Sequence, residues 1–83
     1  MKLTCVVTPD ELYGGASGYV SRCPELGVAS QGETIEEARA MLREAVEGFL
    51  EVADAQEIQR RLAENAGMVS TLEINATTYA EAA

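Results

Sequence analysis

The stretch from Tyr19 to Glu51 constrains the fold of this chain most, because it joins two strands to a helix without any spacer. Polar and apolar residues alternate over 19–23, and a short strand resumes over 28–31. The Pro-Glu-Leu-Gly sequence between them, at 24–27, is typical of a tight turn. A connection this short leaves no room for a crossover helix, so the two strands are expected to pair antiparallel.

The helix that follows is expected to begin at Thr34. The Thr34 hydroxyl can accept a hydrogen bond from the backbone N–H of Glu37, whose carboxylate can reach back to the N–H of Thr34. Gly48 is expected to allow a close approach or a bend. Apolar residues at every third or fourth position predict one stripe that packs on the sheet: Ile35, Ala38, Met41, Leu42, Ala45, Phe49 and Val52.

The flanking segments extend this pattern. Residues 1–8 alternate and predict a first strand, with a long, mobile hairpin loop over 9–18. A second helical segment is expected over 54–65, where Glu57 and Arg61 are spaced as an ion pair.

Residues 68–75 alternate again and predict a last strand. The expected fold is α+β, with an antiparallel sheet in β-β-β-α-(α)-β order and one main helix packed on one face. Residues 1–75 should form a single domain, followed by a C-terminal tail over 76–83 that carries no DNA-binding domain.

Charge and size restrict the partners of this chain. The formal net charge is -8, from 14 acidic and 6 basic side chains in 83 residues. Such a chain repels the phosphate backbone of nucleic acids and attracts a basic protein. The single core of a chain this short provides little net stability, so we expect a homodimer or a higher homo-oligomer.

The residue types present favour binding over catalysis. The chain has no histidine, which removes the commonest general base and the usual zinc ligand. Cys5 and Cys23 fit no metal-binding spacing and are expected to be reduced, small apolar residues. Neither a signal peptide nor a membrane span is evident, so a cytoplasmic protein without metal or cofactor is expected.

Four acidic residues near strand ends leave a metal-dependent nuclease open as an alternative, because converging carboxylates could hold Mg²⁺. Solvated charges at turns are the simpler interpretation of these residues. They are Asp10, Glu25, Glu33 and Glu73.

The motifs over 18–51 resemble the HicB-like antitoxin family. They are Gly-Tyr-Val at 18–20, Cys-Pro-Glu-Leu-Gly at 23–27, the Ser-Gln-Gly-Glu-Thr-x-Glu-Glu-Ala run at 30–38 and Glu-Ala-Val-Glu at 44–47. The resemblance implies a reduced ribonuclease-H-like fold without catalytic carboxylates. It also implies binding to a small basic toxin of the HicA type, which cleaves mRNA and whose active site the antitoxin covers.

Many relatives also carry a C-terminal DNA-binding segment, which the remaining residues after Asn75 do not match. The expected function is therefore that of an antitoxin, or of an interaction module derived from one. A stand-alone homo-oligomer with a structural or small-ligand-binding role stays open as the alternative. Seven residues are expected to contact the partner: Tyr13, Tyr19, Glu25, Glu33, Glu36, Glu44 and Glu47.

Overall fold

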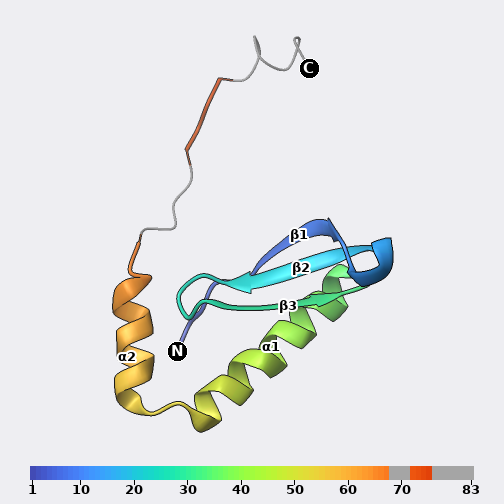
Figure 1. Ribbon diagram of the computed structural model, residues 1–83. Helices are drawn as coiled ribbons and strands as arrows, with labels where there is room; N and C mark the ends of the chain where they lie inside the picture. Colours follow the sequence, from blue (N-terminus) through green and yellow to red (C-terminus); the bar gives the residue numbers. More distant parts are fainter. Residues whose placement is uncertain (68–71, 76–83) are drawn as a thin grey trace.

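The computed structural model describes residues 1–67 and 72–75, which form a three-stranded sheet and two helices. The strands follow the order β1-β2-β3 with antiparallel pairing, and α1 lies across one face of the sheet (Figure 1). The α+β class and the antiparallel meander are therefore confirmed. The elements are β1 (Val6–Glu11), a 3-10 turn η1 (Tyr13–Gly15), β2 (Ser17–Cys23), β3 (Val28–Gly32), α1 (Ile35–Val52) and α2 (Ala55–Glu64).

The first strand was expected over 1–8, but β1 begins later and runs through Pro9 and Asp10. Proline is tolerated here because β1 is an edge strand, and no described residue on its outer side needs the missing N–H. The prediction of a long loop over 9–18 is therefore wrong, because the loop is shorter. The connection is confined to 12–16, where Gly14 and Gly15 adopt positive φ angles of 86° and 81°.

The last strand was expected over 68–75. Residues 68–71 lie outside the described residues, as does the tail over 76–83. Residues 72–75 belong to no strand or helix, and the side chains of Leu72 and Ile74 are 85% and 67% exposed. A strand over 72–75 is therefore wrong for this structure, and β1 and β3 are the two edges of the described sheet.

One of the two hydrogen bonds expected at the start of the main helix is confirmed, because the Glu37 N–H donates to the Thr34 hydroxyl at 3.0 Å. The expected apolar stripe is only partly correct. Ala38 and Leu42 are buried, whereas Val52 is 84% exposed. Ile35 and Met41 are also exposed, although less than Val52. An 18-residue helix is about 27 Å long and the five-residue β3 about 17 Å, so α1 extends beyond the sheet it covers.

The helix sits unusually close to the sheet at its first turns. The buried hydroxyl of Ser21 donates to the Ala38 carbonyl oxygen at 2.7 Å. A Cβ atom added to Gly32 would lie 2.4 Å from the backbone nitrogen of Ala38, so only glycine fits at this point of β3. Beyond this contact, Leu42 packs with Cys23 and Leu26 to form the small core.

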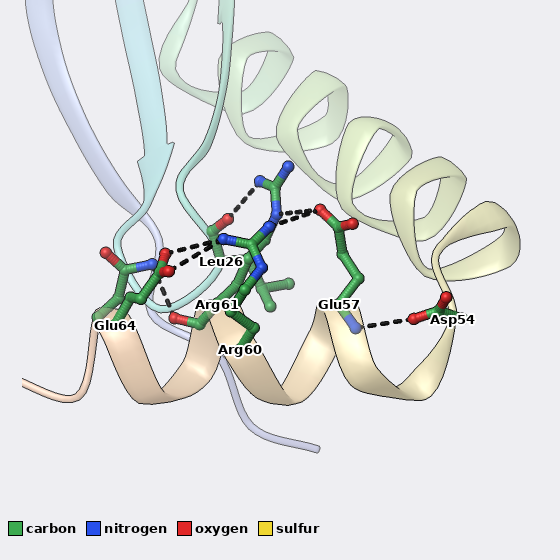
Figure 2. Close-up of polar contacts among 7 residues, drawn as sticks. Leu26, Asp54, Glu57, Arg60, Arg61 and Glu64 are labelled. Atoms are coloured by element: carbon green, nitrogen blue, oxygen red, sulfur yellow. Dashed lines mark hydrogen bonds and ion pairs between the residues drawn. The ribbon is translucent and has the colours of Figure 1, made fainter.

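The second helix matches the prediction closely, since Asp54 caps its start and Asn65 its end. Arg61 holds it to the body of the protein: the guanidinium donates to the Leu26 carbonyl oxygen at 2.9 Å and lies 4.4 Å from the centroid of the Phe49 ring. The expected ion pair with Glu57 is confirmed at 3.1 Å (Figure 2). One side chain thus joins α2, α1 and the β2–β3 turn.

Neither helix in the described parts of the chain has the combination of length and apolarity that crossing a bilayer requires.

Replacing Gly32 with alanine should destabilise the fold by about 1–3 kcal/mol, because the new methyl group would overlap backbone atoms of α1. Gly48→Ala is the matched control, since it lies inside α1 and an added Cβ meets open space. It should raise the free energy of unfolding by about 0.5–1 kcal/mol through helix propensity. Urea unfolding measures both values, and equal stability of the two variants would contradict the close contact.

Candidate functional site

A concave, acidic surface lies at the hairpin end of the sheet, and we call it the acidic hollow. Its volume is about 610 Å³, and its lining contains three carboxylates and one aromatic ring but neither Lys nor Arg. The lining comes from β1, from β2 and from the link between β3 and α1. Its residues are Pro9, Asp10, Glu11, Ser17, Gly18, Tyr19 and Glu33.

The strand register brings these residues together. Tyr19, on the central strand, is paired with Pro9 of β1 and with Gly32 of β3. Its side chain points to the same face as those of Ser21 and Cys23, because side chains alternate along a strand. Glu33 follows Gly32 directly, so the contact between Gly32 and α1 also determines where the Glu33 carboxylate lies.

The hollow can attract a cationic group. Asp10, Glu11 and Glu33 supply negative potential, and a concave surface strengthens such a field. The half-buried Tyr19 ring adds a face on which a guanidinium or ammonium group can stack. Within residues 1–67 and 72–75, no group of three or more Asp, Glu, Cys or His side chains is arranged to hold a metal ion.

The four acids of the nuclease alternative do not form one cluster. Asp10 and Glu33 line the acidic hollow, whereas Glu25 lies in the turn at the opposite end of β3. Glu73 belongs to the segment 72–75, which is outside the sheet.

Glu25 has an internal role that the sequence did not indicate. Its carboxylate accepts hydrogen bonds from the Thr4 hydroxyl at 2.7 Å and from the Thr4 N–H at 2.9 Å. The thiol of Cys23 approaches the other oxygen at 3.7 Å. The hydrogen bond from the Thr4 hydroxyl is the main cause that lowers the pKa of Glu25 below its ordinary value. Glu25 therefore fastens the N-terminal segment to the β2–β3 turn.

The remaining expected contact residues are divided between two surfaces. Tyr13 lies in η1 at the tip of the β1–β2 hairpin and is not among the residues that line the acidic hollow. Glu36, Glu44 and Glu47 are exposed on α1, where Glu47 pairs with Arg43 at 3.0 Å. The structure thus brings Tyr19 and Glu33 together and leaves the helix glutamates on a separate face.

A second concavity of about 590 Å³ lies between α1 and the first residues of the chain, and we call it the apolar groove. Met1, Leu3, Cys5, Leu42 and Val46 supply its apolar lining. Two glutamates and two arginines, Glu36, Arg39, Arg43 and Glu47, surround it. The sequence analysis missed this groove, although the alternation of Leu3 and Cys5 could have indicated an apolar face there.

Both cysteines of the groove are free thiols, as expected. Cys23 is buried, and the burial raises the pKa of its thiol above the ordinary value. It packs in the core with Leu26 and Leu42.

The lowered pKa of Glu25 makes its contribution to stability depend on pH. A carboxyl group with a depressed folded pKa stabilises the fold above its unfolded pKa, about 4.5, and this contribution disappears as pH falls through the folded pKa. Glu25→Gln should therefore lower the free energy of unfolding at pH 7, and the difference from the unmodified chain should shrink as pH falls below about 4.5 and disappear below the folded pKa. Glu33→Gln is the control, and urea unfolding is the measurement. A Glu25→Gln effect that is constant with pH would contradict the assignment.

The chain was compared with models of known protein families, with curated proteins and with solved structures, and none of them matches it.

Proposed function

We propose that this chain is a HicB-like antitoxin, or an interaction module derived from one, that binds a small basic mRNA-cleaving toxin of the HicA type and covers its active site. Its fold would then be a variant of the reduced ribonuclease-H-like arrangement of that family. In this role the protein acts in the cytoplasm and needs neither metal nor cofactor. The acidic hollow is the observation that carries the proposal.

Charge complementarity is the physical basis of this proposal. An RNA-cleaving protein must present Lys and Arg to bind phosphates, and the same side chains are attracted to a surface of opposite sign. The hollow offers carboxylates at Asp10, Glu11 and Glu33 around the Tyr19 ring, which suits one inserted Arg or Lys side chain. The partner's catalytic surface would thereby be covered by protein.

The exposed glutamates of α1 give a second, flatter contact in the same proposal. The helix carries five glutamates and two arginines, so its solvent face is acidic overall. This face would contribute mainly to the rate of association, because exposed charges steer encounter more than they hold a complex.

A catalytic role has less support. The chain contains no histidine, and Asp10 and Glu25 lie at opposite ends of β2. The Glu25 carboxylate is also occupied by Thr4. We therefore propose that the chain is not an enzyme and that Glu25 supports the fold rather than the partner contact.

Binding to a purified small basic RNA-cleaving protein of the HicA type tests the proposal. Isothermal titration should show a complex that weakens as salt is raised, and RNA cleavage by that protein should stop when the complex forms. Glu33→Lys should weaken binding about tenfold or more, because it places a like charge opposite the inserted cation.

Glu64→Lys on α2 is the matched control, since it changes the net charge equally but lies outside the hollow. Its affinity should stay within about threefold of the unmodified chain, as expected for a distant, screened charge. An equal loss of affinity in both variants would show that binding depends on the net charge and not on the acidic hollow. Continued RNA cleavage in the saturated complex would contradict the antitoxin proposal.

A further inference from the structure

Two apolar surfaces of this chain lack cover among the described residues. The first is the apolar groove, with Leu3 and Cys5 on one wall and Leu42 and Val46 on the other. β1 continues directly from the groove residues Leu3 and Cys5, and it pairs with β2 alone among the described strands. Its outer edge over 6–8, ahead of Pro9, keeps its N–H groups and can accept an additional strand.

The second surface is the segment 72–75. Leu72 and Ile74 are separated by one residue, so in an extended conformation both side chains point to the same face. They are 85% and 67% exposed, and the segment stands clear of the sheet (Figure 1). This is the pattern of a strand with one apolar face.

We infer that residues 72–75 of a second copy of this chain add to the outer edge of β1 over 6–8, ahead of Pro9, and insert Leu72 and Ile74 over the apolar groove, while the first copy does the same in return. Because each copy carries both the groove and the segment, a two-fold exchange leaves neither uncovered. The resulting homodimer is closed and buries two further apolar side chains per copy.

The distribution of charge favours this surface for contact between copies. Two chains of net charge -8 repel each other across most of their surfaces. Around the apolar groove, however, Arg39 and Arg43 balance Glu36 and Glu47. The groove is thus a place where two acidic copies can meet with little repulsion, whereas the acidic hollow is not.

The size of the core gives a reason for the exchange. Among the described residues of this 83-residue chain, the buried apolar side chains are Cys23, Leu26, Ala38 and Leu42, which make a small core. Chains of this size commonly need oligomerisation to reach adequate stability. The acidic hollow lies at the other end of β1 from the groove and stays open in such a dimer.

Sedimentation equilibrium of the full chain tests this inference. The unmodified protein should be a dimer, and the double variant Leu72→Asp, Ile74→Asp should raise the dissociation constant at least about tenfold while its circular dichroism spectrum keeps the helical signal. Val52→Asp is the control, because Val52 is an exposed apolar residue outside the groove. It should leave the dimer unchanged.

Mixing two variants that each fail to dimerise tests whether the segment of one copy binds the groove of the other. Leu3→Asp, which impairs the groove, and the double variant, which impairs the segment, should each be monomeric. Together they should form a weak heterodimer that retains one intact contact.

An unmodified chain that is monomeric at its highest soluble concentration would overturn the inference, and so would a dimer that persists in the double variant. A monomer whose unfolding free energy falls in the double variant would show instead that the segment covers its own groove. Loss of dimerisation with unchanged affinity for the basic protein would separate this surface from the proposed toxin contact.

Discussion

The close approach of α1 to the sheet determines the positions of both concave surfaces. Gly32 lets the backbone of Ala38 come within a distance that any side chain would prevent, and the buried Ser21 hydroxyl is satisfied there by donating to the Ala38 carbonyl oxygen. Because Glu33 follows Gly32, the same contact places a carboxylate at the rim of the acidic hollow. It also directs α1 across the sheet, which leaves the apolar groove beside the first residues of the chain.

The two surfaces differ in their chemistry, and this difference allows one small domain to serve two kinds of contact. The acidic hollow combines carboxylates with an aromatic ring and is suited to a basic partner. The apolar groove has balanced charges at its rim and is suited to another copy of the same chain. In the proposed assembly, dimerisation contributes stability and the hollows remain available for the partner.

Local signals in the sequence were reliable guides to the fold. Thr34 and Asp54 each cap a helix as their residue types predict, and the turn at 24–27 lies where expected, with φ at Gly27 of +68°. The extent of β1 and the buried side of α1 depend on pairing register and on the relative lengths of helix and sheet. The acidic hollow joins residues near 10, 18 and 33, so no single stretch of sequence reveals it. The hydrogen bonds between Glu25 and Thr4 could not be predicted, because the two residues lie 21 positions apart in the sequence.

The most direct test of the central claim is amide chemical-shift mapping by NMR of the labelled chain as a small basic protein of the HicA type is added. The account predicts that the largest shifts occur at Asp10, Ser17, Tyr19 and Glu33, the residues of the acidic hollow. Shifts concentrated instead on α2 or around the apolar groove, or no shifts at low salt, would contradict it.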